Sequence, residues 1–207
     1  LKSPRVFIAA TDVETGRAAI FSGKRVTAQD VMASACLPQL FQAPEINGKL
    51  YWDGGYASNP PLGPLVESEG SQDILLVQIN PLRRTDKPTT AAEITDRVND
   101  LTFNASLIAQ MRTIGLVNDL VDSGAAQPGL RRIRMHRIGG DGVLDELAPA
   151  SKTTPEPQTV ERLFELGRQA ANRWLKKHLA SVGEKGTVNI RRDYGDPLRL
   201  DFGTPES

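Results

Sequence analysis

The pattern of apolar and polar positions divides the chain into short strands and helices with one apolar side. An apolar, β-branched run at 6–13 predicts a buried strand, and residues 18–21 predict a second strand that pairs with it as a hairpin. Two short apolar segments at 45–52 flank Asn47-Gly48, the strongest short-range hairpin signal in the chain. The nearly all-apolar run at 74–79 predicts a central strand covered on both faces.

Two helix starts are marked by capping residues. Thr27 with Asp30 in the following turn resembles a capping box, and Pro38 ends the helix that this box begins. Asn59 followed by Pro60 predicts an N-cap and a first helical residue, so we expect a short helix from Pro60 to about Glu67.

Longer helical periodicity occurs in the second half of the chain. Apolar residues recur at helical spacing over 91–121, with breaks expected at Gly115 and at Ser123-Gly124. The same spacing predicts a last helix at about 160–179, and the alternation at 133–138 predicts a strand with one wet face. The helix at 160–179 carries basic residues on its polar face, which most simply is solvated.

Strands that alternate with helices, one of them apolar on both sides, indicate a three-layer α/β/α domain. A mixed central sheet is expected because two of the strand pairs have the pattern of hairpins. Residues 139–159 are rich in turn formers and predict a surface loop, and residues 181–207 show little periodicity and predict an irregular C-terminal tail. Residues 1–180 are therefore assigned to one domain.

Composition narrows the class of protein. The chain has 207 residues with 25 basic and 25 acidic side chains, and a net charge of zero argues against nucleic-acid binding by phosphate neutralisation. Cys36 is the single cysteine, which excludes an internal disulfide or a cysteine-based zinc site and fits a reducing compartment. No apolar run reaches the roughly 18 residues that span a bilayer.

The sequence lacks the residues that several kinds of active site require. His136 and His178 are far apart and have no carboxylates at ligand spacing, so no metal site is predicted. Neither phosphate-loop pattern is present, and no serine lies in a G-x-S-x-G nucleophile elbow. Ser34 lies within a predicted helix and is expected to be a small packing residue, and Cys36 is expected to be a buried apolar group.

Asp53 is the remaining candidate for chemistry. It ends an apolar run at 50–52 and precedes Gly54 and Gly55, whose missing Cβ atoms allow a sharp turn and a close approach. Asp-Gly-Gly is also a common turn sequence, and these three residues alone favour that interpretation. An acid at a strand end ahead of a helix is, however, a frequent position for catalytic groups in α/β enzymes.

The wider context of Asp53 resembles the C-terminal half of the patatin-like phospholipase family. The helix and Pro-Phe segment, the spacer and the Asp-Gly-Gly motif form a specific combination, whereas Asp-Gly-Gly alone would not. The long helix is similar to that of bacterial members. The matching segments are 7–13, 28–41, 51–56, 59–61, 94–114 and 166–175.

The resemblance implies a lipid acyl hydrolase that uses a Ser-Asp dyad and no cofactor or metal. The family's Asp-Gly-Ala/Gly motif corresponds to Asp53, Gly54 and Gly55, with Asp53 as the base that accepts the proton of the serine. Serine attacks a lipid ester, and water then releases the fatty acid from the acyl-enzyme. The serine elbow and the oxyanion loop lie N-terminal to the matching region in the family, so this chain alone is expected to be inactive.

Two functional hypotheses remain open. The first is a phospholipase, lysophospholipase or esterase that is active with an N-terminal part, and the second is a non-catalytic patatin-like module for binding or assembly. The chain opens at Leu1 almost directly on a strand, which predicts a start within a domain. Partners expected are a lipid ester, the N-terminal part, a membrane surface and a second copy of the chain; a cytoplasmic or peripheral membrane location is favoured.

Overall fold

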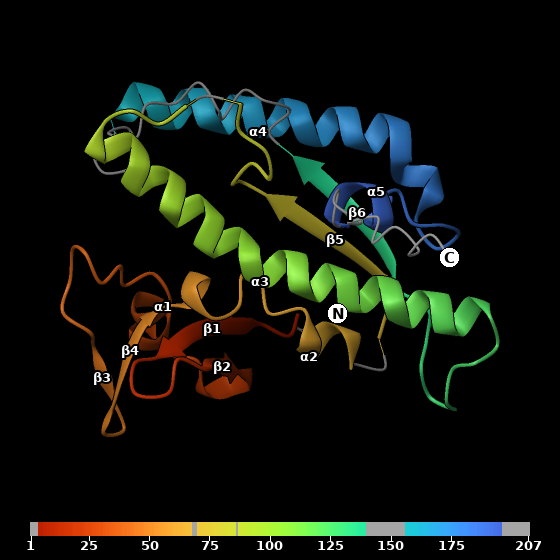
Figure 1. The fold of residues 1–207 in the computed structure, drawn as a ribbon, viewed down its shortest axis with the longest axis horizontal. Helices are drawn as coiled ribbons and strands as arrows, with labels where there is room; N and C mark the ends of the chain where they lie inside the picture. Colours follow the sequence, from red (N-terminus) through yellow and green to blue (C-terminus); the bar gives the residue numbers. More distant parts are fainter. Residues whose placement is uncertain (1–3, 68–69, 86, 140–155, 196–207) are drawn as a thin grey trace, which may run out of the picture.

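A computed structural model describes residues 4–67, 70–85, 87–139 and 156–195 (Figure 1). The strands are β1 (Phe7–Asp12), β2 (Ala18–Ser22), β3 (Glu45–Ile46), β4 (Lys49–Asp53), β5 (Asp73–Gln78) and β6 (Arg134–Gly139). The helices are α1 (Ala28–Ser34), α2 (Gly63–Val66), α3 (Ala91–Asp122), α4 (Pro157–His178) and α5 (Ile190–Tyr194). Three 3₁₀ turns complete the elements: η1 (Gly23–Arg25), η2 (Gly54–Tyr56) and η5 (Leu179–Ser181). The chain is therefore a mixed α/β protein, as its sequence pattern predicts.

The N-terminal strands form an antiparallel sheet in the order β2-β1-β4-β3. Both predicted hairpins are present. Asn47 and Gly48 have φ angles of 53° and 78°, the left-handed values that a tight hairpin turn requires. Ala10 of β1 pairs with Asp53 of β4, so β1 lies directly beside the candidate acid.

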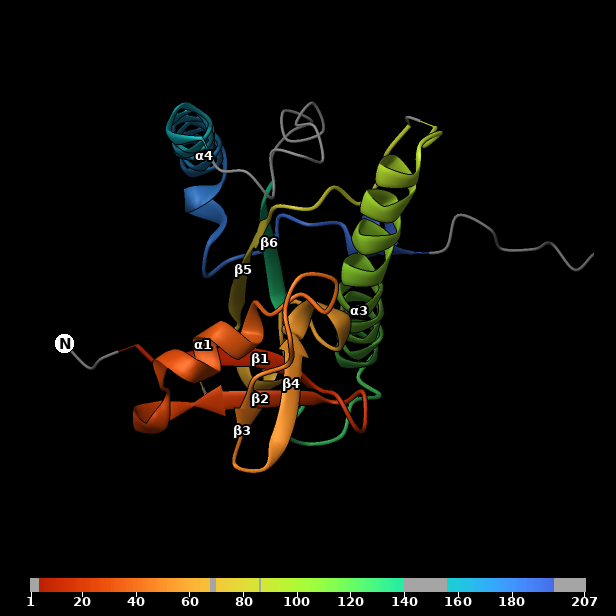
Figure 2. The same ribbon diagram turned by 90° about the vertical axis from the view of Figure 1, so that its left-hand side faces the viewer.

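The C-terminal strands form a separate parallel pair, β5 and β6. Figure 2 shows this pair between α3 on one side and α4 on the other. The expected single mixed central sheet is therefore not formed by the described residues, whose strands belong to two sheets. In the described part of the chain, β5 pairs along one edge alone, and no described strand joins it to the antiparallel sheet.

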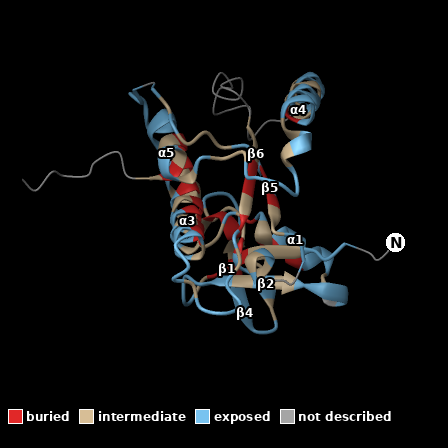
Figure 3. Ribbon diagram, turned by 90° about the vertical axis from the view of Figure 1, so that its right-hand side faces the viewer, coloured by how far each residue is buried: buried red, intermediate tan, exposed pale blue. Residues whose placement is uncertain are grey.

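Burial is uneven between the two sheets (Figure 3). The larger core lies between β5, β6, α3 and α5, and a smaller core lies between β1, β4 and α1. The larger core comprises Leu62, Ile74, Leu76, Leu107, Met111, Ile114, Ile133, Met135 and Tyr194. The smaller core comprises Ala10, Ala33 and Tyr51, with Ala19, Phe21 and Ile46 packed against it.

The long helix α3 is continuous, so the expected break at Gly115 is wrong. The missing Cβ of Gly115 instead allows the helix to approach α5: a Cβ there would lie 3.0 Å from Ile190. The helix ends at the predicted place, with Ser123 as its C-cap. Thr90 and Glu93 form a capping box at its start, and the backbone N–H of Thr89 also donates to Glu93, which lowers the Glu93 pKa to about 2.

Two further expectations differ from the structure, and a third is untested. Val77 of β5 is 66% exposed and Leu75 is 45% exposed, so β5 is not covered on both faces by the described residues. The tail expected to be irregular contains α5, which the sequence pattern missed because a helix of this length shows too little periodicity. Most of the loop expected at 139–159 lies outside the described residues.

The helix expected from Pro60 is also wrong in its start. The Asn59–Pro60 peptide bond is cis, and α2 begins at Gly63 with Leu62 as its N-cap. The segment before α2 makes its hydrogen bonds to side chains of α3 in place of a helical turn. The first helix agrees better: Thr27 and Asp30 form the predicted capping box, and α1 ends at Ser34, before Pro38.

Candidate active site

Asp53 is the last residue of β4, and its backbone is held on both sides. Its N–H donates to the carbonyl of Cys36 over 2.8 Å, and its carbonyl accepts from Thr11 Oγ1 over 2.7 Å. Its side chain caps the turn that follows, since Oδ1 accepts the Gly55 N–H over 2.7 Å. Among the described residues, no group donates to Oδ2. The carboxylate is thus fixed through one oxygen and leaves the other available to a further donor.

The two glycines after Asp53 are required to different degrees. A Cβ on Gly54 would lie 2.1 Å from the backbone oxygen of Ala9, a clash that only a shift of β1 or of the turn could relieve. A Cβ on Gly55 would lie 2.7 Å from the ring of Phe103 and 3.0 Å from Asp53 Oδ1. The geometry therefore requires glycine at the first position, and a side chain at the second would require Phe103 and the Asp53 carboxylate to shift.

Helix α3 holds the segment that follows the turn. The Tyr56 ring meets Phe103 edge to face at 5.3 Å, and Ser106 Oγ accepts the Asn59 N–H over 3.0 Å. Gln110 accepts the N–H of Leu62 over 2.9 Å and donates to the carbonyl of Pro60 over 3.0 Å. Phe103, Ser106 and Gln110 lie at helical spacing on one side of α3. This side of α3 positions the Asp-Gly-Gly turn.

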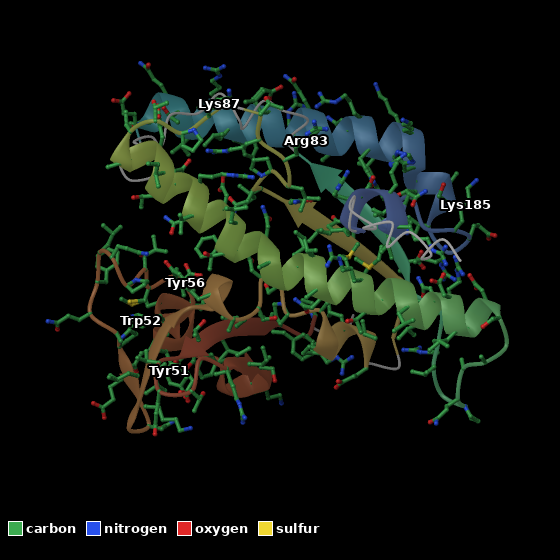
Figure 4. All side chains as sticks on the ribbon, in the orientation of Figure 1. Tyr51, Trp52, Tyr56, Arg83, Lys87 and Lys185 are labelled. Atoms are coloured by element: carbon green, nitrogen blue, oxygen red, sulfur yellow. The ribbon has the colours of Figure 1, made fainter. Side chains whose placement is uncertain are left out.

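Aromatic side chains gather around the candidate acid. Figure 4 shows Tyr51, Trp52 and Tyr56 around β4 and the turn, while Arg83 and Lys87 lie across α3 near α4. The Tyr56 hydroxyl exchanges hydrogen bonds with the amide of Gln39, at 2.9 and 3.0 Å. Aromatic residues therefore precede and follow Asp53 along the chain, and Gln39 is bound to the last of them, Tyr56.

This environment changes the acidity of Asp53. Burial raises the pKa of Asp53 above its ordinary value of 3.8, and the hydrogen bond from Gly55 offsets this only in part. A carboxylate with a raised pKa is a stronger base, which suits proton transfer from a hydroxyl. Burial, and secondarily the nearby charge of Asp53, raises the pKa of the Cys36 thiol, so this thiol stays protonated at neutral pH.

The other candidate residues have structural roles. Cys36 is buried, as predicted, and its Sγ donates to the carbonyl of Gln42 over 3.3 Å. Ser34 does not pack in a core: its hydroxyl donates to the carbonyl of Val31 within α1. His178 ends α4, where a cation is favoured.

His136, on β6, is buried in the structure. It is 1% exposed, with Nε2 3.0 Å from Asp73 Oδ1 and Nδ1 3.1 Å from Thr187 Oγ1, and its ring meets Trp174 edge to face. Sequence pattern could not show this burial, because Asp73, Thr187 and Trp174 come from distant parts of the chain. The signal that was present is the short alternation around His136, which is ambiguous about the buried face.

The remaining described structure offers no competing chemistry. Among the described residues, no group of three or more His, Cys, Asp or Glu side chains could hold a metal ion. No helix in the described ranges is long and apolar enough to cross a membrane. Two cavities, of about 480 and 180 Å³, lie along the C-terminal half of α3, and neither is lined by Asp53.

Comparison with known proteins agrees with the geometry. No curated protein matches the sequence. The family model described as Patatin-like phospholipase matches residues 16–66, the stretch that includes α1, β4, Asp53 and both glycines of the turn. This match confirms the resemblance found in the sequence: residues 16–66, about a quarter of the chain, are similar to the patatin-like phospholipase family.

Proposed function

We propose that Asp53 is the catalytic base of a serine acyl hydrolase acting on lipid esters. The match to the family model over residues 16–66 supports a lipid hydrolase in general terms. The observation that supports the specific role is the Asp53 carboxylate: Oδ1 is fixed by Gly55, Oδ2 has no donor among the described residues, and the pKa is raised. Oδ2 is then the atom that accepts a proton.

The reaction proposed is acyl transfer to water through a Ser-Asp dyad. As the serine oxygen attacks the ester carbonyl, its proton passes to Oδ2 of Asp53, and the alcohol leaves with a proton from the same carboxyl. Water, deprotonated by Asp53, then attacks the acyl-serine and releases the fatty acid. Phospholipids, lysophospholipids and acylglycerols are the substrate class that the family resemblance implies.

The nucleophilic serine is proposed to lie on a part of the protein N-terminal to these residues. No serine of this chain lies in a nucleophile elbow, so the chain alone is expected to be inactive. Leu75 and Val77 on β5 and Phe164 on α4 are exposed apolar side chains, and β5 and β6 lie between α3 and α4 (Figure 2), which supports a covering segment there. Such a segment would complete a three-layer arrangement.

Two buried indole groups agree with this proposal. The Nε1 atoms of Trp52, on β4, and of Trp174, on α4, are buried and have no acceptor among the described residues. Buried donors nearly always have a hydrogen-bond partner in folded proteins. A segment that packs between the two sheets is one source of such acceptors.

Asp53→Asn in the complete protein tests the proposal. The amide oxygen of Asn can still accept from Gly55, so the turn should keep its geometry, while the base is lost. We expect hydrolysis of a short-chain nitrophenyl ester to fall about 10²- to 10⁴-fold, with an unchanged unfolding midpoint. The matched control is Asp119→Asn, an exposed acid paired with Arg191 at the other end of α3, which should keep the parent rate.

The pH dependence of hydrolysis tests the role of Asp53 independently. The base acts only when ionised, so kcat/KM should fall as the pH decreases through a pKa above 3.8. An Asp53→Asn variant that hydrolyses the ester at the parent rate would exclude the role of Asp53. It would favour the alternative, a patatin-like module for binding or assembly.

A further inference from the structure

One stretch beside Asp53 lacks charge altogether. No Asp, Glu, Lys or Arg occurs between Asp30 and Glu45, in a chain in which such residues make up 24% of the total. We call residues 31–44 the uncharged segment. Four of its apolar side chains are exposed: Val31 50%, Met32 72%, Leu40 55% and Phe41 62%.

The exposure belongs to an ordered turn. The N–H groups of Leu40 and Phe41 both donate to the carbonyl of Leu37 over 3.0 Å, and Cys36 Sγ donates to the carbonyl of Gln42. In Figure 1 the connection from α1 to β3 projects from the left side of the molecule. Several exposed apolar side chains in one ordered, uncharged connection indicate a contact surface.

The uncharged segment is joined to the candidate base by main-chain hydrogen bonds. The carbonyl of Cys36 accepts the N–H of Asp53 over 2.8 Å, and the carbonyl of Pro44 accepts the N–H of Tyr51 over 3.1 Å. The middle of the segment, at Cys36, and its C-terminal end, at Pro44, therefore lie against β4. A surface that the segment contacts would lie next to Asp53.

We propose that the uncharged segment is the surface by which the protein contacts a lipid aggregate, with Met32, Leu40 and Phe41 entering its apolar boundary. The choice of lipid rests on the proposed acyl-hydrolase function, which places an ester substrate at Asp53. The absence of charge supports it: a protein partner's interface has a polar rim, whereas an acyl boundary disfavours every charge. Binding should accordingly depend little on salt or on anionic lipid.

Sedimentation with phosphatidylcholine vesicles tests the proposal without requiring catalysis. The parent protein should bind, and the double variant Met32→Gln/Phe41→Gln should bind about tenfold or more weakly. The matched control is Leu116→Gln/Leu130→Gln, which should bind like the parent. Leu116 is an exposed leucine on α3, and Leu130 is an exposed leucine in the connection from α3 to β6. Far-UV circular dichroism confirms that each variant is folded.

A tryptophan introduced at position 41 locates the contact. The fluorescence that Phe41→Trp adds to that of the two native tryptophans, measured against the parent, should be quenched when brominated phosphatidylcholine replaces the ordinary lipid. The proposal would be overturned if the parent did not bind, if this quenching were absent, or if both double variants lost binding equally. The same outcomes would be seen if another part of the protein covered the segment. Asp53→Asn should bind vesicles like the parent, so a protein that binds but never hydrolyses separates this inference from the proposed catalysis.

Discussion

Two aspartates at strand ends have opposite environments in this molecule. Asp73, at the start of β5, accepts from Arg134 over 2.8 and 3.0 Å, from the Gly183 N–H over 3.0 Å, and lies 3.0 Å from His136 Nε2. The carboxylate of Asp53, at the end of β4, receives one hydrogen bond among the described residues, from the Gly55 N–H. The pKa of Asp73 is lowered by the Arg134 hydrogen bonds, whereas burial raises that of Asp53.

The same contrast extends to the regions around them. Asp73 borders the larger core, where α3, β5, β6 and α5 bury most of the apolar side chains. Asp53 lies beside the smaller core of Ala10, Ala33 and Tyr51. A fully paired carboxylate holds elements together, and an incompletely paired one keeps an oxygen for chemistry. The comparison predicts that substitutions near Asp53 alter activity more than stability, and that those near Asp73 do the reverse.

The largest effect is expected from Gly54→Ala in the complete protein. Its Cβ would meet the backbone oxygen of Ala9, so the turn must shift and displace the Asp53 carboxylate. A displacement of about 1 Å costs roughly 100-fold in rate, measured as kcat/KM for the short-chain ester. Gly63→Ala, at the first residue of α2, is the matched control, because a Cβ there would meet no atom within 4 Å, and it should keep the parent rate. Equal losses in the two variants would contradict the geometric argument.

The second largest effect is expected from Asp73→Asn, as a loss of stability. Asp73→Asn removes the carboxylate that Arg134 and His136 share, and should lower the free energy of unfolding at pH 7 by roughly 3 kcal/mol. The pKa of Asp73 is lower in the folded state, so its contribution is present above the ordinary value of 3.8 and is lost as the pH falls below it. Urea denaturation at pH 7 and pH 3 measures both.

The control for Asp73 is Asp122→Asn. Asp122 pairs with Arg132 at the surface, and exposed pairs contribute about 0–1 kcal/mol. The difference between parent and Asp73→Asn should narrow at pH 3, because protonation begins to remove the same contribution from the parent. A gap that widens on acidification would show that Asp73 is not the stabilising anion of this network.

Local sequence signals predicted much of this molecule. The Asn47-Gly48 hairpin, the Thr27–Asp30 capping box and the strand end at Asp53 depend on neighbouring residues, whose backbone preferences are visible in the sequence. The family resemblance, confirmed over 16–66, then directed attention to Asp53. The resemblance also implied the role of Asp53, which stays a prediction.

Long-range contacts explain what the sequence could not show. Asn59 and Pro60 have the pattern of a helix start, but Ser106 and Gln110 of α3 bind this segment, which is not helical. His136 is buried by partners more than fifty residues away in the chain, and α5 is held by the core through Tyr194. Such contacts arise from tertiary packing, which overrides local propensity.

The smallest effect tests whether α3 positions the turn from a distance. Ser106→Ala removes the acceptor of the Asn59 N–H and should lower the free energy of unfolding by about 1 kcal/mol. Thr113→Ala is the matched control, since the Thr113 hydroxyl donates only to the carbonyl of Ala109 within α3 itself among the described residues. Hydrogen exchange of the Asn59 amide should accelerate in Ser106→Ala and not in Thr113→Ala. An unchanged exchange rate would mean that Phe103 and Gln110 hold the segment without Ser106, and that the turn at Asp53 depends on packing more than on this hydrogen bond.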